Sequence, residues 1–161
     1  MAQRLSLERL AALLPLRGDR HDLRLTTPPV DGTVELAIVR VESGEAFGVL
    51  ALAAESPATL DVLHLWVAPP LRGYGAGSEA AALLLIAATR SGFDAIHAWA
   101  HPGLGLSVYF WIRMGLHPLH GPGPNAGLRF ERTLTRSATA EGSAPRLRVA
   151  PHLRASPGRV R

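Results

Sequence analysis

Hydrophobic and polar positions alternate in ways that predict both helices and strands along the first 134 residues. Apolar residues between Ser6 and Leu14 have helical spacing, Ser6 is a favoured N-cap residue, and Pro15 predicts the helix end. Residues 34–41 and 46–53 are apolar runs separated by a short polar turn. This arrangement predicts a β-hairpin, because strands joined by a brief turn pair antiparallel.

The middle of the chain then switches repeatedly between strand and helix. A strand is expected at 60–67, where Pro69 ends it, and an alanine- and leucine-rich helix follows from Ser78 to its stop at Gly92. The remaining expected elements are a strand at 94–100, an aromatic-rich helix at 103–114, and strands at 116–120 and 128–134. We therefore expect an α/β (α+β) fold.

Composition fits one globular domain. The 161 residues are 47% hydrophobic and only 19% charged, which is enough apolar surface for a core. There is no cysteine, so disulfides and a thiolate nucleophile are excluded. The longest apolar run, 80–88, is about nine residues where a membrane span needs roughly 20. We expect a cytoplasmic protein with no membrane or metal partner.

The positive charge is concentrated at the end of the chain. All 17 basic residues are arginine, a usage typical of a GC-rich bacterial genome. Residues 135–161 hold six arginines against one acid, whereas residues 1–134 hold eleven against twelve. The domain is thus predicted to be residues 1–134, followed by a flexible arginine-rich tail at 135–161. Because the domain itself has almost no net charge, its composition argues against nucleic-acid binding.

A glycine-rich segment joins the third expected strand to the helix after it. In Arg72-Gly73-Tyr74-Gly75-Ala76-Gly77-Ser78, hereafter the glycine loop, three glycines let backbone N–H groups approach a ligand closely. The loop also ends at a helix N-terminus, which attracts phosphate, and Arg72 adds a cationic donor. The sequence therefore predicts a phosphate site here, although a tight turn that needs glycine only for its geometry explains the same residues.

Two other phosphate-binding motifs fit less well. Residues 75–80 match a dinucleotide fingerprint, which expects an acid at the end of the following strand. Asp94 precedes that strand, however, and His101-Pro102 follows it. A Walker loop requires lysine, which the chain lacks.

In this setting the glycine loop resembles that of the GNAT superfamily of N-acetyltransferases, whose signature is Arg or Gln, two residues, Gly, one residue, then Gly or Ala. The resemblance extends from about Val34 to Leu134. It implies a mixed, mostly antiparallel sheet with a central splayed parallel strand pair and helices on both faces. Residues 1–33 depart from the family because they are short and offer one convincing helix.

The resemblance also implies a cofactor and its site. Acetyl-CoA would be the co-substrate, with its pyrophosphate on the amides of residues 72–78 and its pantetheine arm on the backbone of Trp66 and Val67. The amide near Val67 would stabilise the oxyanion. The family's tyrosine acid falls on Trp111, and its asparagine falls on Leu104, so both positions differ here. An indole N–H donates a hydrogen bond but supplies no proton.

Several side chains are candidates for acid–base catalysis. His64 lies mid-strand, His101 lies where the next strand ends, and His97 is a weaker candidate within that strand. Tyr109 and Tyr74 are alternative acids, but Tyr109 lies two residues from Trp111 and so points nearly the other way on a helix. Each of these residues also has a purely structural explanation. Tyr109, Phe110 and Trp111 in particular are typical core aromatics.

These features favour an N-acetyltransferase in which an amine attacks acetyl-CoA directly. A catalytically weak or inactive CoA-binding sensor is the alternative. The expected partners are acetyl-CoA and an unidentified amine acceptor, and the features are compatible with a monomer or a homodimer.

Overall fold

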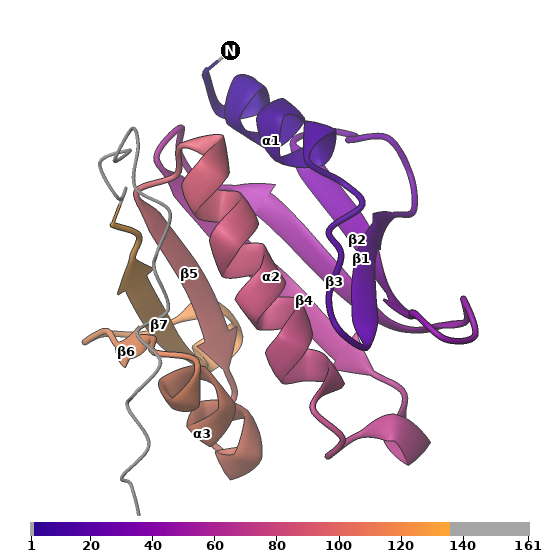
Figure 1. Cartoon of the computed structure of the whole chain (residues 1–161). Coiled ribbons are helices and arrows are strands. Elements are labelled where there is room, and N and C mark those ends of the chain that lie inside the picture. Colours follow the sequence, from indigo (N-terminus) through magenta and orange to yellow (C-terminus); the bar gives the residue numbers. More distant parts are fainter. Residues whose placement is uncertain (1, 136–161) are drawn as a thin grey trace, which may run out of the picture.

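A computed structural model describes residues 2–135 of the chain, apart from the side chains of residues 2–5 and 124. In this part it contains three α-helices, seven strands and two short 3₁₀ turns. Figure 1 shows how they are arranged. The helices are α1 (Ala2–Ala12), α2 (Ala76–Ser91) and α3 (Gly105–Arg113). The strands are β1 (His21–Leu25), β2 (Thr33–Arg40), β3 (Ala46–Ala54), β4 (Thr59–Val67), β5 (Ala95–Ala100), β6 (His117–Pro118) and β7 (Leu128–Thr133).

All seven strands form one mixed sheet in the order β1-β2-β3-β4-β5-β7-β6. Every neighbouring pair is antiparallel except β4 and β5. The parallel pair is joined only over Thr59–Asp61 and Ala95–His97, although both strands continue further. The remaining residues, 62–67 of β4 and 98–100 of β5, we call the open end of the β4–β5 pair. The splayed parallel pair implied by the family resemblance is thereby confirmed.

The hydrophobic core lies between the helices and one face of the sheet. Alternate residues of the strands point into it, such as Leu36 opposite Leu50. Helix α2 contributes a largely alanine surface, and these small side chains let the helix lie close to the strands. Its C-terminus has Gly92 in the left-handed conformation at φ +90°, as the sequence predicted for its stop.

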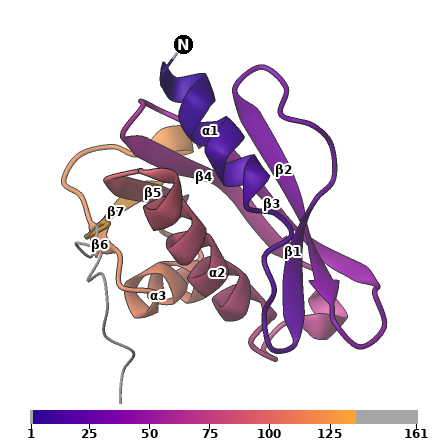
Figure 2. The same cartoon turned by 45° about the horizontal axis from the view of Figure 1, so that its top comes forward.

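The opposite face of the sheet is not covered by any helix of residues 2–135. Helices α1, α2 and α3 all lie over the same face in Figures 1 and 2. On the other face the side chains of His64 and Trp66 are exposed, and the facing residues Val49 and Ala51 of β3 are only half-buried. The expectation of helices on both faces is therefore not met in this part of the chain, because the N-terminal region supplies only α1 and this helix packs beside α2.

The N-terminal region differs from its prediction in two further ways. Helix α1 begins at Ala2, so Ser6 is inside it and donates its hydroxyl hydrogen bond to the carbonyl of Pro57 instead of capping the helix. Residues 21–25 form strand β1, which was not expected from the sequence. The run His-Asp-Leu-Arg-Leu has only two apolar positions, so its strand conformation depends on pairing with β2.

The C-terminal predictions are met in part. Strand β7 occupies 128–133 as expected, but β6 is limited to two residues of the expected 116–120. The arginine-rich tail predicted for 135–161 lies outside the described residues except for Thr135. Within residues 2–135, none of the helices is long and apolar enough to cross a membrane.

Candidate active site

The glycine loop lies between the end of β4 and the first turn of α2. A short 3₁₀ turn, Pro69–Leu71, leads into it, and Gly75 is the N-cap of α2. Gly73 and Gly75 have φ values of +86° and +85°, a region that side-chain-bearing residues seldom adopt. Gly75 has no side chain to accept hydrogen bonds from the first amides of α2. These N–H groups are therefore available to an anionic ligand.

Three exposed arginines lie around this helix N-terminus. The Nε of Arg72 donates to the carbonyl of Val67 at 2.7 Å, which closes the loop onto the end of β4. Arg113 of α3 donates to the Ser78 hydroxyl at 3.3 Å. Arg20, from the segment before β1, donates to the carbonyl of Tyr74 at 3.3 Å. Only Arg72 belongs to the sequence motif. Arg20 and Arg113 are distant in sequence and lie beside the loop because of the tertiary fold.

The segment containing Arg20 is fixed to α2 through Glu79. This carboxylate accepts a hydrogen bond from the Arg20 amide at 3.0 Å and lies 2.5 Å from Nδ1 of the buried His21. Partial burial acts to raise the pKa of Glu79, but the Arg20 amide and His21 outweigh it and hold that pKa below its ordinary value. A Cβ at Gly18 would collide with the His21 carbonyl oxygen and then with the Glu79 carboxylate, so close packing also requires that glycine.

We expect Glu79→Gln to destabilise the fold by roughly 1 kcal/mol at neutral pH, because it removes a charged hydrogen-bond acceptor. Because the pKa of Glu79 is lower in the native state than in the unfolded state, its ionisation stabilises the protein at pH values above the unfolded-state pKa. This stabilisation is lost as pH falls through the native-state pKa. The difference between wild type and variant should therefore shrink below about pH 4.5. Urea unfolding at pH 7 and pH 3.5 measures it, with the exposed Glu45→Gln as control. An equal loss at both pH values would contradict the assignment.

The open end of the β4–β5 pair leaves backbone groups of β4 unpaired on one side. The amide of Ala68 donates to Phe47 of the preceding segment, at 2.9 Å. Because successive residues of a strand point their polar groups in opposite directions, the N–H and carbonyl of Val67 face the open end. Arg72 already occupies that carbonyl, which leaves the Val67 N–H, among the described residues, free to donate.

A bulge and an indole shape the same region. The pairing of β3 with β4 passes from Ala51↔His64 to Leu52↔Val62, so Leu63 is an extra residue of β4. Its carbonyl accepts a hydrogen bond from Nε1 of Trp99 in β5 at 3.1 Å. The indole thus spans the two strands beyond the point where their backbone pairing ends. Trp99 was not among the candidates from the sequence, since an isolated tryptophan in a strand is typical of packing.

The structure does not bring the candidate catalytic residues from the sequence together at one place. His64 is exposed on the uncovered sheet face beside the bulge. His101 follows β5, and its Nδ1 accepts a hydrogen bond from the Gly103 amide in a local turn. Tyr109 is 61% exposed on α3, whereas Trp111 is 7% exposed within the core. These two side chains lie on opposite sides of the helix, as their spacing predicted, and Trp111 has the packing role that the sequence also allowed.

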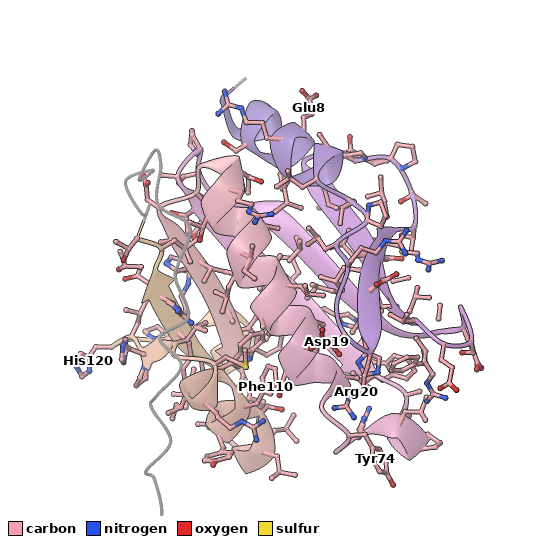
Figure 3. The ribbon with its side chains drawn as sticks, viewed as in Figure 1. Glu8, Asp19, Arg20, Tyr74, Phe110 and His120 are labelled. Carbon is pink, nitrogen blue, oxygen red and sulfur yellow. The ribbon has the colours of Figure 1, made fainter. Side chains whose placement is uncertain are left out.

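Phe110 of α3 lies beside the glycine loop. A Cβ built at Gly77 would lie 3.7 Å from the Phe110 ring. Figure 3 shows Phe110 beside the first turn of α2, with Arg20 and Tyr74 further along the same end of the molecule. Phe110 also packs edge-on against Trp111, with ring centroids 4.8 Å apart. The helix phase, which cannot be read from the sequence, decides which aromatic faces the loop.

A row of ionisable side chains crosses the uncovered face of the sheet at the start of the open end. Asp61 of β4 pairs with His97 of β5, which pairs with Glu131 of β7. The two ring nitrogens of His97 lie 2.7 Å from Glu55 and 2.8 Å from Glu131. Glu55 also accepts a hydrogen bond from Arg129 at 2.6 Å.

Asp61 differs from its neighbours because its carboxylate makes none of these bonds. The side chain is half-buried at the last paired position of β4. Burial raises the pKa of Asp61 above its ordinary value and Glu55 adds to this effect, while Arg129 and His97 act against it. An acid with a raised pKa beside an open strand end is a candidate general base. No sequence signal points to it, since a lone aspartate in a strand has no distinguishing spacing.

No protein-family model matches the sequence, and no curated protein is significantly similar to it. Solved structures do match the fold. A GNAT family acetyltransferase from Elizabethkingia anophelis with acetyl-CoA bound superposes with a TM-score of 0.62 over 73% of this chain and 100% of its own, at 11% identity. IAA acetyltransferase from Bacillus cereus superposes with a TM-score of 0.56 over 64% of this chain and 79% of its own, at 15% identity. Tetrahymena GCN5 superposes with a TM-score of 0.55 over 66% of this chain and 71% of its own, at 11% identity.

This chain has the GNAT fold. Within residues 2–135 the otherwise antiparallel sheet has one parallel strand pair, β4 and β5, and helix α2 follows β4. The resemblance placed the glycine loop between this strand and this helix. In this GNAT fold the loop, the free amide of Val67 and Asp61 all belong to the β4–α2 segment or lie beside it.

Proposed function

We propose that the protein is an acetyl-CoA-dependent N-acetyltransferase. The observation that supports this most is the position of the glycine loop: it leads from the open end of the β4–β5 pair into the N-terminus of α2. A thioester cofactor with a phosphate at one end and an extended arm at the other needs these two features side by side. The GNAT fold, which one solved neighbour has with acetyl-CoA bound, is consistent with this site.

The residues of the loop fit coenzyme A. Gly73 and Gly75 have left-handed φ values, and nothing lies within 4 Å of a Cβ built at Gly73. Phosphate oxygens can therefore approach the first amides of α2 without meeting a Cβ at Gly73 or Gly75. Arg20, Arg72 and Arg113 surround the site with positive charge. The arm would extend along β4, where the outward backbone groups of residues 65 and 67 lie beyond the last pairing with β5. Trp66, which the resemblance placed against the arm together with Val67, instead turns its backbone groups toward Val49 of β3.

The chemistry that follows is attack of a neutral amine on the thioester carbonyl. The Val67 N–H is the donor for the oxyanion that develops on that carbonyl, as the family resemblance implies. Asp61 is the proposed general base, because its raised pKa makes it a better proton acceptor than an ordinary aspartate and the acceptor ammonium must lose a proton. It lies six residues before Val67 on β4, about 20 Å along the strand, so the proton would pass to it through water at the open end and not by direct contact. The thiolate then leaves without a covalent enzyme intermediate.

A CoA-binding protein with little or no turnover is the second candidate function. It is favoured by α3, where Trp111 is in the core, Tyr109 points to solvent and Leu104 is 59% exposed in place of a polar residue. Within residues 2–135 this helix therefore presents no acid to a departing sulfur. A good leaving thiolate needs less assistance than an alkoxide, so this arrangement weakens catalysis without excluding it.

Thiol release separates the two functions directly. Because the chain has no cysteine, a thiol-reactive dye detects only the thiol of free CoA. We expect acetyl-CoA to bind with a micromolar Kd by calorimetry and thiol to appear with at least one member of a panel of primary amines. Binding without thiol release across the panel would favour the sensor, and absence of acetyl-CoA binding at millimolar concentration would refute both functions.

A further inference from the structure

Arg20 lies at the glycine loop although it is 54 residues before Tyr74 in the sequence. Its Nη2 donates to the Tyr74 carbonyl at 3.3 Å, and a Cβ built at Gly75 would be 3.2 Å from the same nitrogen. Figure 3 shows Arg20 and Tyr74 adjacent at the end of α2 that holds its N-terminus. The guanidinium is therefore next to the left-handed glycine at the helix N-cap.

The backbone of Arg20 is held in place independently of its side chain. Its amide donates to the Glu79 carboxylate, and its carbonyl accepts a hydrogen bond from the Val41 amide at 2.9 Å. The next residue, His21, is buried against Phe47 and also contacts Glu79. An exposed arginine on such a fixed backbone gives up less conformational freedom when it binds a ligand than one on a loose loop.

The contact of Glu79 with the Arg20 amide and His21 also affects the charge near the glycine loop. Glu79 lies in the first turn of α2, where a carboxylate would repel a bound phosphate. Its hydrogen bonds go to the amide of Arg20 and to His21, both of which lie outside the loop. The same contact that occupies this carboxylate thus delivers the cationic side chain of Arg20 to Gly75.

From this arrangement we infer that Arg20 is a further binding residue of the proposed CoA site and contacts the pyrophosphate. The inference rests on the proposed function. It assigns a cofactor role to the N-terminal segment, which the glycine motif does not include. Four of the five donors of a guanidinium remain after the bond to Tyr74, enough for two phosphate oxygens.

Calorimetry with CoA tests this assignment. We expect Arg20→Gln to raise the Kd about tenfold, the loss of one exposed charge-assisted contact, and Arg20→Lys to recover part of that loss. Arg9→Gln on α1 is the matched control, since it removes the same charge from an exposed arginine at the other end of the molecule. Circular dichroism melts check that each variant is folded.

A second ligand locates the contact. 3′-Dephospho-CoA keeps the pyrophosphate but lacks the ribose phosphate, so Arg20→Gln should weaken it by the same factor as CoA. A loss seen only with CoA would overturn the pyrophosphate assignment. Equal Kd values for wild type and Arg20→Gln would overturn the role of Arg20 while leaving the proposed function intact, whereas failure of the wild type to bind CoA refutes the proposed function itself.

Discussion

Gly75→Glu should abolish binding of CoA and acetyl-CoA, with a loss of at least a hundredfold in affinity. The substitution places a carboxylate at the N-cap of α2, where a Cβ would already lie 3.2 Å from Arg20. That carboxylate would pair with the guanidinium and occupy the amides that a phosphate needs. Calorimetric titration with CoA measures the effect.

Backbone strain needs a separate control, because Gly75 has a φ of +85°. Gly32 has a φ of +74°, has nothing within 4 Å of the position that a Cβ would take, and lies at the other end of β1 and β2. Gly32→Glu therefore introduces similar strain, about 1 kcal/mol or more, and the same charge far from the loop. Both variants should melt at lower temperature, but only Gly75→Glu should fail to bind. Unchanged affinity in Gly75→Glu would show that the phosphate lies elsewhere.

Asp61→Asn should lower kcat/KM by about a hundredfold or more while leaving the Kd for acetyl-CoA within about twofold. Asparagine has nearly the same shape but accepts no proton at neutral pH, so only the proton-transfer step is removed. Thiol release against pH measures it. The wild-type rate should rise with pH as Asp61 loses its proton, and this limb should disappear in the variant.

Stability should change in the opposite direction from activity. Burial raises the native pKa of Asp61 above the ordinary 3.8, so above that pH the unfolded chain ionises more readily and the native state is disfavoured. Asp61→Asn removes this cost, and its gain in the free energy of unfolding should grow as pH rises from 4 to 7. A variant that is slower yet more stable would be difficult to explain by misfolding.

Glu35→Gln is the matched control, since Glu35 is an exposed carboxylate on β2 and its loss changes the net charge equally. It should keep wild-type turnover. If Asp61→Asn also kept wild-type turnover, Asp61 would not be the base, and His64→Ala and His101→Ala would then test the histidines identified from the sequence.

Local sequence was sufficient to predict many of the strands and helices, because hydrophobic patterning, helix propensity and turn residues act over a few neighbouring positions. Strands β2, β3 and β4 follow from β-rich apolar runs bounded by turns, and α2 follows from a helix-forming run that ends at Gly92. The loop glycines were identifiable because left-handed φ values leave little choice of residue. For the same reason the proposal that phosphate binds at this loop could be made from the sequence by itself.

Tertiary structure decided which side chains surround that site. Strand β1 exists through its pairing with β2, and Arg20 reaches Gly75 because His21 and Arg20 bind Glu79 far along the chain. Asp61 acquires its raised pKa from burial and from Glu55, neither of which has a sequence signature. Trp111 enters the core and Phe110 faces the loop because the rotation of α3 is set by packing against β5 and α2. These contacts join residues distant in sequence, whose free energies depend on the whole fold, so spacing along the chain could not predict them.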